Sequence, residues 1–270
     1  MSKMPTIFIP HGGGPCFFMD WNPPDTWNKM SDYLQRIPAD VGQKPKAMVV
    51  ISGHWEEPAV TVQTNPAPPL LFDYYGFPDH TYKLEYAAPG SPELALRLEG
   101  LLAESGIRTT TDSERGFDHG VFIPLKLAFP DADIPIVQIS MRADLDPAFH
   151  ITVGEALQPL RDEGVLILGS GLTYHNMQTM MRNIKAGGGE APGAAAFDRW
   201  LTETVTAPDY RVRNRNLVNW EQAPSARDAH PREEHFIPLH VVAGAAGPDV
   251  GRKMLEDTVL GAAESAFQFG

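Results

Sequence analysis

The sequence has a single cysteine, Cys16, among its 270 residues. One cysteine cannot form an internal disulfide, which excludes a disulfide-stabilised scaffold and favours a reducing compartment. No apolar run approaches the ~20 residues that are needed to span a bilayer. The N-terminal stretch also has too few apolar residues for the core of a signal peptide. We therefore expect a cytoplasmic protein with no membrane partner.

Basic residues are also scarce. The chain carries 22 lysines and arginines against 34 aspartates and glutamates, which gives a formal net charge of −12. No dense basic patch offsets this excess, so the chain as a whole repels nucleic acid. We expect no nucleic-acid partner, and nothing in the sequence indicates the number of subunits.

Several common catalytic signatures are missing. There is no His-Glu-x-x-His helix, no Cys-x-x-Cys pair and no Gly-x-x-x-x-Gly-Lys phosphate loop. His11-Gly12-Gly13-Gly14 is similar to the oxyanion loop of some lipases, but the Gly-x-Ser-x-Gly elbow that such enzymes require is absent. A serine hydrolase and a phosphate-loop enzyme are therefore disfavoured.

Short, continuous apolar runs are present instead, and they are typical of strands buried on both faces. They cover residues 6–9, 47–51, 134–139 and 165–168. Helical patterns are expected from Pro92 to just before Gly106, from Pro147 to Gly164, and over residues 193–206 and 233–246. This alternation predicts an α/β fold of three layers, with a mostly parallel or mixed central sheet flanked by helices. We treat residues 1–270 as one domain.

The nine histidines are informative through their positions. His11, His54 and His175 each follow a predicted buried strand by a few residues, at the sheet edge where α/β proteins bind ligands. His119 and His235 open predicted helices. Neutral imidazole is a common ligand of zinc, iron and copper, so the cluster predicts a transition-metal site. His80, His150, His230 and His240 lack this context and are expected to be structural.

The segments around these five histidines resemble the class III extradiol ring-cleaving dioxygenases, in the branch of the DOPA 4,5-dioxygenase-like (LigB-type) enzymes. The matching segments are the turn at His11, Ile51-Ser52-Gly53-His54-Trp55, Gly116-Phe117-Asp118-His119-Gly120, Gly169 to Asn176, and Glu234-His235-Phe236-Ile237-Pro238-Leu239. They occur in the family's order and together extend over most of the chain. The resemblance implies an active-site cleft at the carboxyl ends of the strands.

The resemblance also implies a non-haem Fe(II) cofactor, with zinc possible in isolated protein. The implied metal ligands are His11, His54 and His235, and Glu234 is a rival for the third position because the wider class uses a glutamate there. His175 is the implied acid–base residue and a possible fourth ligand in the resting state. His119 is implied near a substrate hydroxyl.

The expected reaction is cleavage of a substituted catechol, DOPA-like or caffeate-like, by O₂ to a muconic semialdehyde-type product. Arg115, Arg142 and Arg182 lie near the motifs and could bind an anionic side chain, although a surface position is expected for each. Trp55 and Tyr174 could stack on the substrate or simply pack. Two alternatives stay open: a zinc-dependent hydrolase with the same histidines, and a non-catalytic interaction protein on this scaffold.

Overall fold

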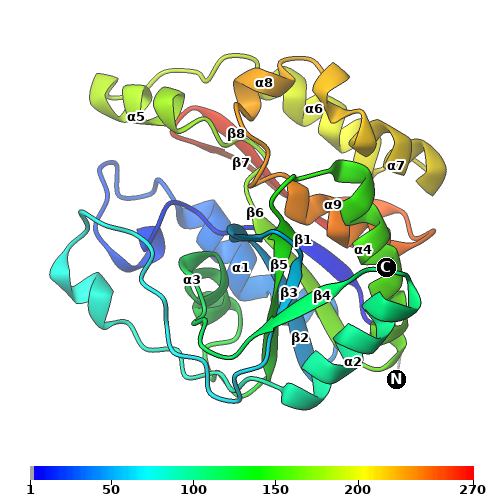
Figure 1. Cartoon of the computed structure of the whole chain (residues 1–270). Helices are drawn as coiled ribbons and strands as arrows, with labels where there is room; N and C mark the ends of the chain where they lie inside the picture. Colours follow the sequence, from blue (N-terminus) through cyan, green and yellow to red (C-terminus); the bar gives the residue numbers. More distant parts are fainter. Residues whose placement is uncertain (1–2) are drawn as a thin grey trace.

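A central sheet with helices packed on both faces organises the protein (Figure 1). The computed structural model describes residues 3–270. Met1 and Ser2 lie outside the described residues. The expectations for the N-terminal stretch and for a single domain over 1–270 include these two residues. The strands are β1 Thr6–Pro10, β2 Ala47–Glu57, β3 Val60–Gln63, β4 Thr109–Asp112, β5 Ile136–Arg142, β6 Val165–Gly171, β7 Gly251–Val259 and β8 Ala262–Phe269.

The strand order in the sheet is β4-β3-β5-β2-β6-β1-β8-β7. The four central strands β5, β2, β6 and β1 run parallel to one another, whereas β8 pairs antiparallel with both β1 and β7. The predicted three-layer α/β fold with a mixed sheet is therefore confirmed. The carboxyl ends of β1, β2 and β6 meet at one edge, and this edge carries the site described below.

Alternate residues of the central strands enter two separate apolar cores, as a strand covered on both faces requires. In β2, Met48 and Val50 pack against α1 and α3, whereas Val49 and Ile51 pack against α2, α4 and α9. The helices are α1 Asn28–Val41, α2 Pro92–Glu104, α3 His119–Ala128, α4 Pro147–Asp162, α5 Met177–Ala186, α6 Ala194–Val205, α7 Tyr210–Val218, α8 Ala226–Ala229 and α9 Ile237–Ala246. No helix within residues 3–270 is long and apolar enough to cross a membrane.

Several predicted boundaries were wrong, including that of β6, which continues past residue 168 to Gly171. Strand β2 continues to Glu57, because a bulge between Ile51 and Glu56 lets its pairing with β5 resume; His54 thus lies within the strand. Strand β5 is shifted towards the C-terminus relative to the predicted 134–139. Helix α9 begins at Ile237 and not at residue 233, because residues 234–236 form a turn and Pro238 occupies the first helical turn.

Helix α9, whose N-terminal end follows His235, is fixed tightly in the structure. A Cβ atom on Gly244 would lie 2.1 Å from the Ile151 carbonyl oxygen of α4, so only glycine permits this close approach. At the other end of α9, the buried guanidinium of Arg161 donates to the Ala245 and Ala246 carbonyls, and that of Arg213 donates to Ala243. These contacts satisfy C-terminal carbonyls of α9 that have no partner within the helix.

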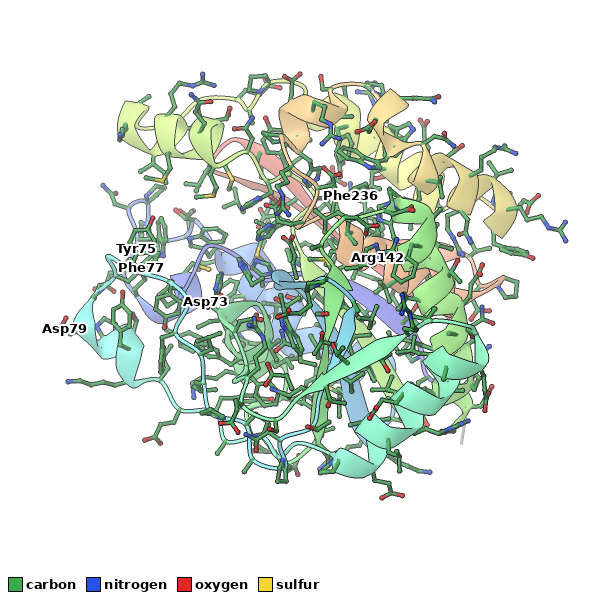
Figure 2. All side chains as sticks on the ribbon, viewed as in Figure 1. Asp73, Tyr75, Phe77, Asp79, Arg142 and Phe236 are labelled. Carbon is green, nitrogen blue, oxygen red and sulfur yellow. The ribbon has the colours of Figure 1, made fainter. Side chains whose placement is uncertain are left out.

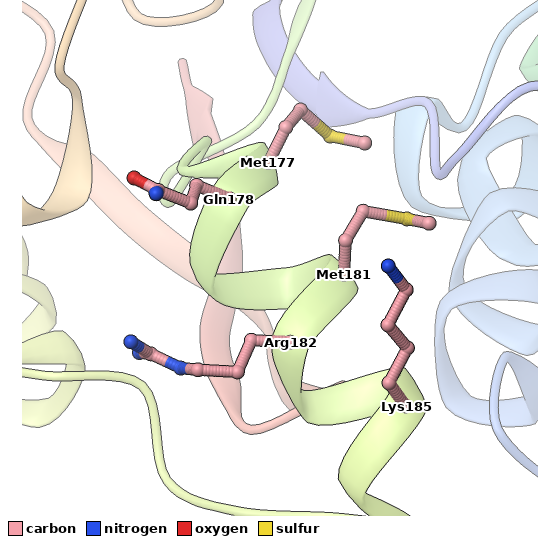
Figure 3. Close-up of a pocket in the computed structure, with 5 residues that line it drawn as sticks. All are labelled: Met177, Gln178, Met181, Arg182 and Lys185. Atoms are coloured by element: carbon pink, nitrogen blue, oxygen red, sulfur yellow. The ribbon is translucent and has the colours of Figure 1, made fainter.

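Two segments flank the functional edge of the sheet. The first is the irregular segment 64–78, which carries Asp73, Tyr75 and Phe77; Figure 2 shows these three side chains on one side of the molecule. The second is α5, which begins two residues after His175. Figure 3 shows Met177 and Met181 on one side of this helix, in a shallow pocket that Gln178, Arg182 and Lys185 also line.

Three histidines outside the predicted cluster make the fold sensitive to acid. Burial lowers the pKa of His150 and of His240 to about 4 and that of His230 to about 3. Below about pH 6.5 the unfolded chain takes up protons at these residues while the folded chain does not, so stability falls as the pH drops from 6.5 towards 4.

We expect the metal-free protein to lose on the order of 2 kcal/mol per buried histidine between pH 7 and pH 5. Glu264 has the opposite effect on stability. Because burial raises its pKa to about 8, it stabilises the fold as the pH falls, but this single group does not offset the several buried histidines. Urea unfolding at the two pH values measures the difference. Equal midpoints would show that these histidines are not held neutral.

Candidate active site

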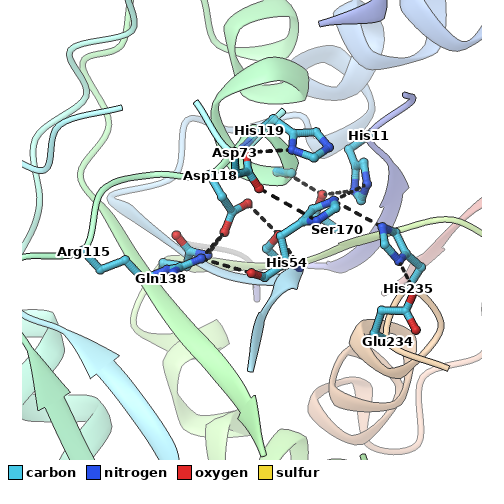
Figure 4. Close-up of polar contacts among 12 residues, drawn as sticks. His11, His54, Asp73, Arg115, Asp118, His119, Gln138, Ser170, Glu234 and His235 are labelled. Atoms are coloured by element: carbon cyan, nitrogen blue, oxygen red, sulfur yellow. Dashed lines mark hydrogen bonds and ion pairs between the residues drawn. The ribbon is translucent and has the colours of Figure 1, made fainter. Parts of the chain in front are cut away.

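The rings of His11, His54 and His235 converge on one point at the carboxyl-end edge of the sheet (Figure 4). His54 Nε2 lies 3.1 Å from His11 Nε2 and 3.2 Å from His235 Nε2. One nitrogen from each residue falls within 4.8 Å of the others, although His11 directly follows β1, His54 lies in β2 and His235 lies in the turn before α9. The three histidines that the sequence singled out as metal ligands are thus brought together.

The outer nitrogens of two of these rings are already used. His11 Nδ1 lies 3.0 Å from Ser170 Oγ, and Ser170 donates its own proton to the Gly120 carbonyl, so His11 Nδ1–H is the donor. His235 Nδ1 donates to Glu234 Oε1 at 3.0 Å. Each ring therefore keeps its lone pair on Nε2, which faces the centre of the cluster. Metal-binding histidines are oriented in this way, with the other nitrogen donating to an outer acceptor.

Electrostatics keep the three rings neutral. Burial first, and then the neighbouring imidazoles, lower the pKa values of His11, His54 and His235 well below the usual value for histidine. Neutral imidazole is the form that binds a transition metal. With their protons on Nδ1, His11 and His235 both present a lone pair at Nε2, and the single Nε2 of His54 can donate to at most one of them, so at least one buried lone pair lacks a donor. This donor set fits a divalent transition metal such as iron or zinc.

His119 lies beside the cluster as the first residue of α3, and its ring centroid is 4.0 Å from that of His54. Its Nδ1 donates to Asp73 Oδ1 at 2.8 Å, and the same oxygen accepts the backbone N–H of His119 at 3.0 Å. Burial alone would raise the pKa of Asp73, but these hydrogen bonds from His119 lower it. The second carboxylate oxygen lies 3.9 Å from His54 Nδ1. Asp73 thereby fixes the orientation of His119.

His175 lies next to another member of the cluster, His235, on which its ring stacks with centroids 3.5 Å apart. Its Nδ1 lies 3.0 Å from Glu234 Oε1, the oxygen that also accepts from His235. Burial alone would raise the pKa of Glu234, but the hydrogen bond from His175 lowers it, so the carboxylate is ionised. Glu234 therefore contacts the outer nitrogens of both rings, and Arg232 lies 3.5 Å from its other oxygen.

A polar network holds the backbone of His54 in place, and Figure 4 shows Arg115, Asp118 and Gln138 as parts of it. The backbone N–H of His54 donates to Ser52 Oγ at 3.2 Å, and Ser52 donates to Asp118 Oδ1 at 2.7 Å. Asp118 also accepts from Gln138 and, at 3.0 Å, from Arg115, which donates to the His54 carbonyl as well. The expected surface position of Arg115 was therefore wrong, because its guanidinium is turned inward to neutralise a buried carboxylate.

Sequence reasoning missed Asp73, Ser170 and Asp118 as parts of the site. Asp118 and Ser170 lie inside motifs that were quoted only for their histidines. Asp73 lies in an irregular segment, 46 residues before its partner His119, and no local pattern marks it.

The remaining candidates have ordinary structural contacts. His150 and His240 hydrogen-bond to backbone groups in the core, and His80 bonds to the Phe18 carbonyl. Trp55 and Tyr174 are each 1% exposed and pack within the protein. Arg142 pairs with Asp144 and lies over the Phe149 ring, and Arg182 donates to Thr179.

Comparisons with known proteins agree with this geometry. A family profile described as the catalytic LigB subunit of aromatic ring-opening dioxygenase matches residues 5–268. The chain belongs to the LigB family. It is an extradiol aromatic ring-opening dioxygenase of the DOPA type, which acts on a small aromatic molecule with O₂. The resemblance drawn from the motifs is confirmed, and enzymes of this family depend on a metal.

Individual LigB-family relatives match along most of their length. The chain is 41% identical to a 4,5-DOPA dioxygenase extradiol from Beta vulgaris over 254 residues, which is 94% of this chain and 91% of the relative. A protein of the same name from Escherichia coli K12 is 36% identical over 90% of this chain and 86% of the relative. A crystal structure of an uncharacterized protein from Escherichia coli K12 superposes with a TM-score of 0.81 at 32% identity, with 99% of this chain and all of the other covered.

Proposed function

We propose that this LigB-family enzyme is an Fe(II)-dependent extradiol dioxygenase that cleaves a substituted catechol, DOPA-like or caffeate-like, to a muconic semialdehyde-type product. The observation that carries the proposal is the convergence of three Nε2 lone pairs, flanked by two further histidines whose outer nitrogens are bound to carboxylates. The relatives named as 4,5-DOPA dioxygenases support the substrate class. We further propose that the chain acts as one catalytic domain in the cytoplasm.

The ligand roles follow from which nitrogens face the centre. We assign His11, His54 and His235 as the metal ligands. Glu234 is the weaker candidate for the third position, because its Oε1 accepts from the outer nitrogens of both His175 and His235. When bound, Fe(II) would supply a coordination point for both catechol oxygens and for O₂, and a path for electron density from the ring to the oxygen.

The remaining chemistry belongs to His175 and His119. With Nδ1–H of His175 held by ionised Glu234, its Nε2 is free to accept a proton from a catechol hydroxyl. The same nitrogen can later return that proton as the O–O bond breaks, with both oxygen atoms retained in the product. His119, held by Asp73 through Nδ1, presents Nε2 to a substrate oxygen. Its role is to orient that oxygen.

Glu234 provides a test of the ligand assignment. Replacing Glu234 by glutamine should weaken metal binding by roughly ten- to hundredfold, as is typical when an outer partner of a metal-binding histidine is lost. His235→Ala should abolish binding altogether. Titration of each variant with Fe(II) or Zn²⁺ under anaerobic conditions measures both affinities. If the Glu234 variant binds less metal than the His235 variant, Glu234 is the third ligand.

Oxygen consumption decides between the proposed function and its rivals. The protein is loaded anaerobically with Fe(II), and O₂ uptake is followed with DOPA, caffeic acid and simple catechols together with the appearance of yellow product. Stoichiometric O₂ uptake supports ring cleavage. Ester hydrolysis by a zinc-loaded enzyme without O₂ uptake, or no turnover with any metal, would contradict the proposal.

A further inference from the structure

Glu264 on β8 is a fully buried acid that the chemistry above does not use. Its residue is 1% exposed, and its Oε1 has no hydrogen-bond partner among the described residues. No cation pairs with it in that part of the chain. Burying a carboxyl group without hydrogen-bond partners for both oxygens destabilises the folded state, and an apolar residue would fill the same space without this penalty. The position of its other oxygen suggests a reason for its presence.

Glu264 Oε2 makes two hydrogen bonds with Thr173. It accepts the backbone N–H of Thr173 at 2.9 Å and the Thr173 hydroxyl at 3.2 Å. The next residue on β8 also contacts Thr173, because the Ser265 backbone N–H donates to Thr173 Oγ1 at 2.9 Å. On the other side of Thr173, His230 Nε2–H donates to its carbonyl at 3.0 Å. Thr173 is therefore held through its N–H, its hydroxyl and its carbonyl.

Thr173 lies in the short connection between β6 and α5, two residues before His175. The neighbouring backbone is held as well: Leu172 N–H donates to the His235 carbonyl at 3.1 Å, and His175 N–H donates to Ala229 at 2.9 Å. A shift of the Thr173 peptide would move the His175 ring, which stacks on His235 and binds Glu234. Small displacements of an acid–base group can cost up to about a hundredfold in rate.

We propose that Glu264 is a positioning residue for His175, which fixes the Thr173 peptide so that the imidazole stays stacked on His235 and hydrogen-bonded to Glu234. The inference rests on the proposed acid–base role of His175. It assigns a functional reason to a buried acid on the C-terminal hairpin, on a strand that contributes none of the five histidines.

The matched variants are Glu264→Ala and Glu264→Gln. Burial raises the pKa of Glu264 to about 8, so at pH 7 the carboxyl is mostly protonated and glutamine is a close neutral mimic. The alanine variant should lose on the order of tenfold or more in kcat with little change in the KM for catechol. Metal content should be unchanged, since none of the three proposed ligands contacts Glu264. The glutamine variant should restore most of the rate.

Two further variants make the test specific. Glu256→Ala removes a glutamate from the same hairpin whose side chain is 82% exposed, and it should leave kcat and metal content as in the wild type. Thr173→Val retains the peptide group but removes the hydroxyl, and it should also lower kcat. This variant provides the test if Glu264→Ala fails to fold. A crystal structure of the zinc-loaded Glu264→Ala enzyme should show the His175 ring displaced from His235.

The outcomes separate the inference from the proposed function. Wild-type kcat in Glu264→Ala with His175 in place, loss of metal together with rate, or failure of glutamine to rescue would each overturn the positioning role. If the wild type cleaves no catechol at all, the proposed function fails, and the position of the His175 ring in the zinc-loaded variant still decides whether Glu264 holds it.

Discussion

Replacing His54 by alanine is expected to remove bound metal and ring cleavage together. His54 is the central member of the cluster, since its Nε2 lies within 3.2 Å of the Nε2 atoms of both His11 and His235. Two imidazoles alone cannot hold a divalent ion firmly. The rate should fall by roughly a thousandfold, equivalent to about 4 kcal/mol of transition-state stabilisation. Metal analysis after dialysis and oxygen uptake measure the two losses.

His80→Ala is the matched control for this prediction. His80 is an exposed histidine whose Nε2 bonds to the Phe18 carbonyl, outside the cluster. Its removal should change neither metal content nor rate. A His54→Ala enzyme that keeps stoichiometric metal would contradict the assignment of His54 as a ligand. Equal loss in both variants would point to a general folding defect.

Much of the fold was predictable because the central strands are covered on both faces. Continuous apolar runs such as 47–51 and 165–168 therefore marked them directly, and the order of strands and helices then implied the layers. The C-terminal hairpin β7–β8 was not predicted. Its strands place acids such as Asp257 and Glu264 in buried positions, so their sequence lacks a clear apolar pattern.

The histidines of the site were predictable for a different reason. Parallel strands end at one edge of a sheet, so residues that follow separate strands, such as His11 and His175, meet in space whatever their distance along the chain. The residues that hold these histidines in place follow no such rule. Asp73 reaches His119 from an irregular segment, and Glu264 reaches Thr173 from an antiparallel strand. Those contacts depend on tertiary packing, which no local spacing encodes.

His175→Ala is expected to separate metal binding from catalysis. The ring of His175 stacks on His235 and contacts Glu234, but its nitrogens are not among the three that we propose as metal ligands. The variant should retain near-stoichiometric Fe(II). Its kcat should fall by roughly a hundred- to ten-thousandfold, the usual contribution of a general acid–base residue.

The comparison between His175→Ala and His54→Ala tests whether His175 transfers protons or binds the metal. If His175 moves protons, its variant has metal without turnover, whereas the His54 variant has neither. Single-turnover oxygen consumption with Fe(II)-loaded protein distinguishes the two states, and metal analysis on the same samples provides the reference. Loss of metal in both variants would make His175 a fourth ligand. Cleavage by His175→Ala at the wild-type rate with iron bound would transfer the proton role to the remaining candidate, His119, which Asp73 orients next to the ring of His54.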